Sequence, residues 1–104
     1  LSVYSSEYIR NGFQGGLQWY RCGLDPQYTA DLQVFSGMKI EVPVCFIAGA
    51  SDWGVYQRPG NLERMQDTVC RNMQGVHLLE GAGHWVQQEQ AETVTKHLIQ
   101  FLNR

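Results

Sequence analysis

The stretch V-P-V-C-F-I-A-G, residues 42–49, decides the fold, because it is a continuous apolar run with β-branched and aromatic side chains. Such a run predicts a strand, here residues 42–48, that is covered on both faces as in a parallel sheet. A second strand is expected at residues 75–80. One helix is expected at residues 61–72, with Pro59 at its first turn, and another helix is expected at residues 89–102. The order strand, helix, strand, helix predicts a parallel pair of an α/β fold.

Residues 1–38 differ in composition from the rest of the chain, because they are rich in aromatic, glycine and polar residues and contain no long apolar run. The expected elements are a helix at residues 5–11 ending near Gly12, a turn at Gly15 and Gly16, and a helix at residues 17–22 stopped at Gly23. We therefore predict a helical lid (cap) segment, residues 1–38, and a strand-helix-strand-helix core part, residues 39–104.

A sheet of two buried parallel strands is not a stable domain in water. The chain also begins with Leu1 rather than Met. We therefore expect a portion of a larger protein, in which further strands of the core, or association of the chain with itself, cover the open strand edges.

Composition excludes several classes of function. The formal net charge is −2 and no run of Lys or Arg occurs, which argues against nucleic-acid binding. No apolar run approaches the roughly 20 residues of a membrane span. The cysteines, which are Cys22, Cys45 and Cys70, form no C-x-x-C pair, so a zinc cage or a redox dithiol is not expected. Three unpaired thiols favour a reducing, cytoplasmic location.

Two ionisable residues follow the two expected strands, Asp52 after the first and His84 after the second. The carboxyl ends of parallel strands meet at one edge of a sheet, where open α/β sheets place their crevice. An imidazole held by a carboxylate is a suitable general base, because imidazole titrates near neutral pH. The alternative is an ordinary loop histidine and a helix-capping aspartate.

No convincing nucleophile accompanies this pair. Ser51 stands in G-A-S-D-W, which has Trp where a nucleophile elbow has its second glycine, and Cys22 has no supporting residues around it. His77 and His97 are expected to be structural, within a strand and a helix. Their elements are expected to point the histidines apart, so no metal site is predicted.

Tyr4 and Tyr8 lie four residues apart and share one face of the first expected helix. They are either a packing pair or, in a functional interpretation, a source of a phenol that donates a hydrogen bond to a developing oxyanion.

Three stretches carry a resemblance to a known family. Residues 4–21, Y-S-S-E-Y-I-R-N-G-F-Q-G-G-L-Q-W-Y-R, resemble the lid segment of α/β-hydrolase-fold epoxide hydrolases. Residues 42–53, V-P-V-C-F-I-A-G-A-S-D-W, are similar to the strand that carries that family's acid. Residues 78–90, L-L-E-G-A-G-H-W-V-Q-Q-E-Q, are similar to its histidine loop. The resemblance implies the C-terminal part of an α/β-hydrolase fold.

The resemblance also implies an activity, the opening of a small apolar epoxide by water to a vicinal diol through an aspartyl ester, in a detoxifying role without metal or cofactor. The implied catalytic residues are the base His84, the acid Asp52 and the lid tyrosine Tyr4. The implied substrate-binding residues are Tyr8, Trp53 and Trp85. The family's aspartate nucleophile and second lid tyrosine have no counterpart here, so the 104-residue chain is expected to be inactive alone.

Two alternatives stay open. The first is a portion of a haloalkane or haloacetate dehalogenase, which resembles this family in its Asp and His half but binds halide with other donors. The second is a non-catalytic module that keeps part of the fold for binding or dimerisation.

Overall fold

The computed structural model describes residues 1–103, which divide into two compact units. Unit 1 is Leu1–Gly37, and unit 2 begins at Met38. The interpretation of the first segment as a lid stays a prediction. Within residues 1–103, every helix is too short or too polar to cross a membrane.

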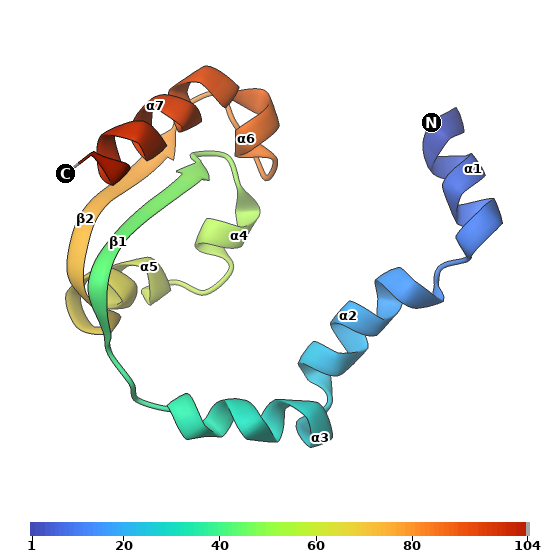
Figure 1. The fold of residues 1–104 in the computed structure, drawn as a ribbon, viewed down its shortest axis with the longest axis horizontal. Helices are drawn as coiled ribbons and strands as arrows, with labels where there is room; N and C mark the ends of the chain where they lie inside the picture. Colours follow the sequence, from blue (N-terminus) through green and yellow to red (C-terminus); the bar gives the residue numbers. More distant parts are fainter. Residues whose placement is uncertain (104) are drawn as a thin grey trace. The chain divides into compact units, whose positions relative to one another are not determined.

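Unit 1 is helical. Its elements are α1 (Ser2–Asn11), α2 (Gln14–Leu24), α3 (Pro26–Thr29) and the 3-10 helix η1 (Ala30–Phe35), as Figure 1 shows. Helix α1 begins three residues before the predicted start at residue 5. It ends at Asn11, so the predicted helix end near Gly12 is confirmed, and Gly12 has φ of +66°, a conformation that favours glycine.

The predicted turn at Gly15 and Gly16 is wrong, because both glycines lie inside α2, and Gly23 does not stop this helix. A glycine costs about 1 kcal/mol relative to alanine inside a helix, which disfavours the helix without breaking it. The helix ends instead at Asp25, whose carboxylate accepts a 2.9 Å hydrogen bond from the N–H of Gln27 and so caps α3. The following Pro26 suits the first position of a helix.

Unit 2 contains a parallel pair of strands with helices between and after them. Its elements are β1 (Ile40–Gly49), α4 (Trp53–Tyr56), α5 (Asn61–Arg64), the π-helix η2 (Met65–Val69), β2 (Cys70–Leu79), α6 (Val86–Glu89) and α7 (Ala91–Leu102). Ala48 pairs with Leu78 and Gly49 with Leu79, so both strands end at the same level. In Figure 1 the two arrows lie side by side and point the same way.

Several predicted boundaries in unit 2 are wrong. The helix expected to residue 72 ends at Val69, and β2 begins at Cys70 rather than residue 75. Pro59 lies outside the helix it was expected to start, because Gly60 with φ +84° separates it from α5. The last helix is two helices, since the backbone leaves helical geometry at Gln90.

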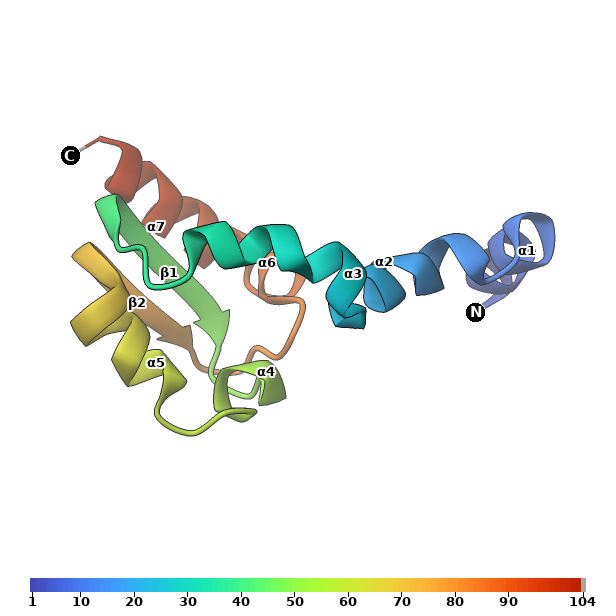
Figure 2. The same cartoon turned by 90° about the horizontal axis from the view of Figure 1, so that it is seen from below.

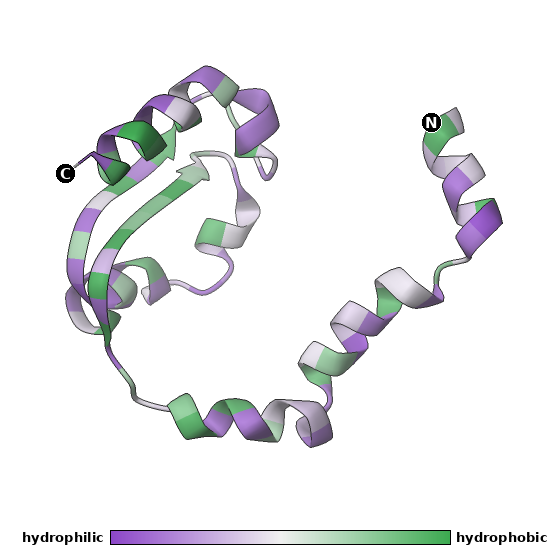
Figure 3. Cartoon of the chain, viewed as in Figure 1, coloured by the Kyte–Doolittle hydropathy of each residue, from purple (hydrophilic) through white to green (hydrophobic). Residues whose placement is uncertain are grey.

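Side chains of β1 pack on both faces of the strand pair. Cys45 and Ile47 line one hollow together with residues of α6 and α7, whereas Phe46 lines another hollow together with Leu62 and Met65. Figure 2 accordingly shows α7 on one side of the strands and α5 on the other, and Figure 3 shows how apolar β1 is.

A small apolar core lies at the carboxyl end of the strands, where Ala82, Val86 and Val94 are buried and pack against Ile47 and Leu79. The amino end of β1 is open, with Ile40 exposed at 43% and Val42 at 65%. Residues 44–47 are half-buried and only Ala48 and Gly49 are buried, so within residues 1–103 the predicted burial of the strand is reached only at its carboxyl end.

Candidate active site

Asp52 stands in the loop where β1 ends, and its carboxylate has two kinds of partner. Oδ1 accepts a 2.8 Å hydrogen bond from the N–H of Gly54, which makes Asp52 the N-cap of α4. The side chain is only 14% exposed. The Gly54 bond stabilises the ionised form and lowers the pKa of Asp52 from its ordinary 3.8, against the opposing effect of burial, and His84 also lowers it.

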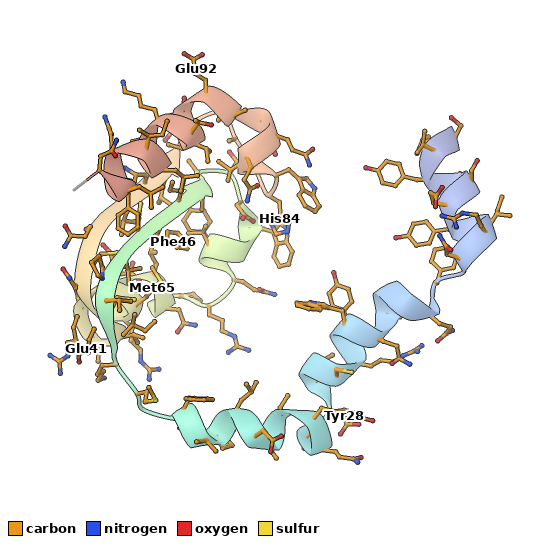
Figure 4. All side chains as sticks on the ribbon, in the orientation of Figure 1. Tyr28, Glu41, Phe46, Met65, His84 and Glu92 are labelled. Atoms are coloured by element: carbon orange, nitrogen blue, oxygen red, sulfur yellow. The ribbon has the colours of Figure 1, made fainter. Side chains whose placement is uncertain are left out.

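His84 stands in the loop after β2 and contacts the same carboxylate. Its Nδ1 lies 3.1 Å from Oδ1 and 3.2 Å from Oδ2 of Asp52. The structure thus brings together the two side chains that sequence analysis expected to meet, and Figure 4 labels His84 on its loop. With Nδ1–H donating to the carboxylate, Nε2 is the nitrogen that can accept a proton. The imidazole is 55% exposed, so water can reach it.

Backbone contacts join the two loops that carry this pair. The N–H of Ser51 donates to the carbonyl of Ala82 at 3.0 Å, and the N–H of Ala50 donates to the carbonyl of Leu79 at 2.9 Å. A Cβ on Gly49 would lie 2.3 Å from the carbonyl oxygens of both Ala82 and Gly83. Glycine is therefore required at position 49 for the loops to approach each other this closely.

Sequence analysis missed one residue of this site. Glu89, expected only to begin a helix, turns its carboxylate back to the histidine loop and accepts hydrogen bonds from the N–H groups of Gly83 at 2.7 Å and Trp85 at 3.0 Å. The available signal was a carboxylate five residues after His84, which is too common a pattern to interpret without the turn geometry.

The pair opens onto a hollow of about 310 Å³. Its lining residues are Phe46, Ile47, Ala48, Asp52, Gly54, Val55, His84, Val86 and Gln87. Two of the expected substrate-binding residues flank the imidazole, with the ring of Trp53 stacked 6.0 Å from it and the ring of Trp85 edge-on at 5.3 Å between centroids. The hollow thus combines an apolar wall, an imidazole and a carboxylate.

The expected tyrosines lie in unit 1. Tyr4 and Tyr8 both line a hollow of about 480 Å³ on α1, together with Ser5, Ile9 and Phe13. The ring of Tyr8 stacks on Phe13 with centroids 4.5 Å apart, and Tyr4 is 72% exposed. The Asp52–His84 contact, by contrast, is made entirely within unit 2.

The expectation that the histidines point apart is wrong for one pair. The rings of His77 on β2 and His97 on α7 stack with centroids 3.8 Å apart, because a strand side chain and a helix side chain meet on the α7 face of the sheet. Among residues 1–103, no group of three or more His, Cys, Asp or Glu is placed to hold a metal ion.

Comparison with known proteins shows which proteins the chain resembles. No protein-family model matches the chain. Epoxide hydrolase A of Mycobacterium tuberculosis is 40% identical over 98% of the chain, and the epoxide hydrolase of Caballeronia sordidicola is 37% identical over 93% of it. The solved structure of potato (Solanum tuberosum) epoxide hydrolase I matches 98% of the chain with a TM-score of 0.79 and 29% identity.

Over nearly its whole length the chain is similar to α/β-hydrolase-fold epoxide hydrolases. It spans 30% and 29% of the length of the two bacterial epoxide hydrolases and 32% of the potato enzyme chain, and it matches a C-terminal portion of this fold. The predicted fold class, part of an α/β hydrolase with a parallel strand pair, is confirmed.

Proposed function

We propose that this chain supplies the base, its orienting acid and a phenol donor to an epoxide hydrolase that converts an epoxide and water to a vicinal diol. The observation that carries the proposal is the contact of His84 Nδ1 with both carboxylate oxygens of Asp52, in a chain whose relatives are named epoxide hydrolases. The nucleophilic carboxylate of this reaction is not among the residues of the chain.

The proposed reaction has two steps. In the first, the external carboxylate attacks an epoxide carbon, the C–O bond breaks, and the phenol of Tyr4 stabilises and protonates the departing alkoxide. In the second, Nε2 of His84 takes a proton from water, and the hydroxide attacks the ester carbonyl, so that the ester C–O bond breaks and the diol and the carboxylate are released. The proton on the imidazolium then returns through solvent to the phenolate of Tyr4, which restores both residues. Asp52 holds the imidazole in the required tautomer and stabilises its cation while the proton is bound.

Each unit separately carries aromatic residues that are suited to an apolar substrate. Trp53 and Trp85 are more than 60% exposed beside the imidazole, and Tyr8 contributes an apolar face to the hollow on α1. Exposed rings next to a base are suited to holding an apolar epoxide, because they bury its hydrocarbon part.

The test is turnover by the protein that carries this chain, with trans-stilbene oxide and a haloacetate as competing substrates. We expect diol from the epoxide, slower ester formation in Tyr4→Phe and slower ester hydrolysis in His84→Gln. Release of halide without formation of diol would identify a dehalogenase instead. Binding without turnover of either substrate would identify a non-catalytic module. Diol formation by the 104-residue chain alone would contradict the external nucleophile.

We also propose that the rest of a hydrolase core, or a second copy of the chain, covers the open edge of β1. Within residues 1–103 this strand pairs with β2 alone, and its first half is exposed. A chain that remains monomeric at high concentration in sizing chromatography would contradict the second-copy form. We further propose a cytoplasmic location and a detoxifying role against reactive epoxides. The location is supported by the three cysteines, which are all free thiols.

A further inference from the structure

The backbone around His84 is held from two directions. On one side, the carbonyl of Ala82 accepts from Ser51 N–H, and the carbonyls of Ala82 and Gly83 lie against Gly49. On the other side, the N–H groups of Gly83 and Trp85, the residues immediately before and after His84, both donate to Glu89. The imidazole therefore projects from a segment whose carbonyl and amide sides are both anchored.

The Glu89 carboxylate divides its two oxygens between these donors. Oε2 accepts from Gly83 at 2.7 Å and Oε1 accepts from Trp85 at 3.0 Å, which spans the position of His84 with a single side chain. Hydrogen bonds to an ionised acceptor are shorter and about twice as strong as those between neutral groups. In glutamine an NH2 group, which donates rather than accepts, replaces one of the two oxygens, so in this two-oxygen arrangement only one of the two bonds is kept.

We propose that Glu89 is a positioning residue for His84. By fixing the amides on both sides of the histidine, its carboxylate sets the direction in which the imidazole leaves the loop, and this direction keeps Nδ1 against Asp52 and Nε2 available for water. The catalytic consequence rests on the proposed function above, whereas the effect on the His84–Asp52 contact does not.

Nuclear magnetic resonance of the protein that carries this chain tests the positioning directly. The ring-nitrogen shifts of His84 report its tautomer, and the amide proton shifts of Gly83 and Trp85 report the bonds to Glu89. In Glu89→Ala we expect both amide signals to move upfield and the ring nitrogens to average between tautomers. Glu89→Gln should give an intermediate result, and Glu92→Gln, which removes the same charge from an exposed position on α7, should change none of these signals.

Unchanged His84 ring shifts in a folded Glu89→Ala protein would overturn the proposal, as would unchanged amide signals. If the alanine variant does not fold, the Glu89→Gln comparison with Glu92→Gln decides in the same way, because the glutamine keeps one of the two bonds.

Kinetics of the protein that carries the chain give the second readout. Glu89→Ala should lower kcat by up to about 100-fold, as expected for a displaced catalytic group, with KM for the epoxide little changed and partial rescue by glutamine. A fall in kcat without rescue, or a change in KM alone, would contradict positioning. If the wild-type protein forms no diol, the proposed function fails, while the spectroscopic result still decides the role of Glu89.

Discussion

Unit 1 and the loop end of unit 2 differ in how tightly each is packed within itself. Among residues 1–37 no residue is buried, and Tyr4 is 72% exposed. In unit 2 the loops after β1 and β2 touch backbone to backbone, and a buried core lies beneath them. The Asp52–His84 pair is therefore built by contacts within unit 2, whereas the proposed role of Tyr4 depends on what unit 1 packs against.

The largest expected effect is a fall in kcat, and it should distinguish two aspartates that each cap a short helix. Asp52 in unit 2 and Asp25 in unit 1 each accept a backbone hydrogen bond, from Gly54 at 2.8 Å and from Gln27 at 2.9 Å. Asp52→Asn should lower kcat by about 10⁴-fold, because an amide favours the wrong imidazole tautomer. Asp25→Asn should leave kcat within about twofold of wild type. Equal effects in a steady-state assay would show that Asp52 acts only as a cap.

The next largest effect is on the free energy of unfolding when one of two glycines is replaced by alanine. A methyl group at Gly49 would overlap two carbonyl oxygens, whereas nothing lies within 4 Å of a Cβ at Gly15 in α2. Gly49→Ala should therefore lower the free energy of unfolding by about 3 kcal/mol and separate the two loops. Gly15→Ala should raise it by up to about 1 kcal/mol. Urea unfolding followed by circular dichroism measures both, and a neutral Gly49→Ala would refute the close contact of the loops.

A third prediction compares the loss of stability when a valine is replaced by alanine in each of the two units. Val94 on α7 is 6% exposed and Val3 on α1 is 73% exposed. Val94→Ala should cost about 2 kcal/mol through lost burial and a new cavity, while Val3→Ala should stay within about 0.5 kcal/mol of wild type. If the two variants unfold at the same urea concentration, unit 1 is as tightly packed as unit 2 and the comparison fails.

The smallest expected effect is on how the stability of unit 2 changes as the pH falls. The folded chain lowers the pKa of Asp52 below 3.8, so the stability that this carboxylate contributes is fully present above that value. It is lost as the pH falls through the lower folded-state pKa. Between about pH 5 and about pH 2, wild type should therefore lose stability more steeply than Asp52→Asn. Superimposable pH profiles from urea titrations would contradict the lowered pKa.

Much of unit 2 could be predicted from the sequence. The apolar run before Gly49 and the rule that parallel strands end at one edge were enough to place Asp52 and His84 together. The start of β2 could not be predicted, because its first residues, Cys-Arg-Asn-Met-Gln, include three polar residues and do not have the pattern of a buried strand.

Other features depend on geometry that residue types do not specify. A pair of glycines such as Gly15 and Gly16 is typical of a turn, yet both lie within α2, because the free-energy cost of a glycine in a helix is too small to end it. The stacking of His77 on His97 follows from how α7 crosses the sheet, which no local pattern reports. The role of Glu89 likewise appears only once the histidine loop turns its amides toward the carboxylate.

The central claim is that an imidazole oriented by Asp52 removes the proton from the water that hydrolyses a covalent ester. The most direct test is the mass of the intact protein that carries this chain after mixing with trans-stilbene oxide. With His84→Gln we predict that an adduct heavier by the mass of one epoxide accumulates, while wild type shows none at steady state. Turnover of His84→Gln at the wild-type rate, with no adduct, would contradict the account.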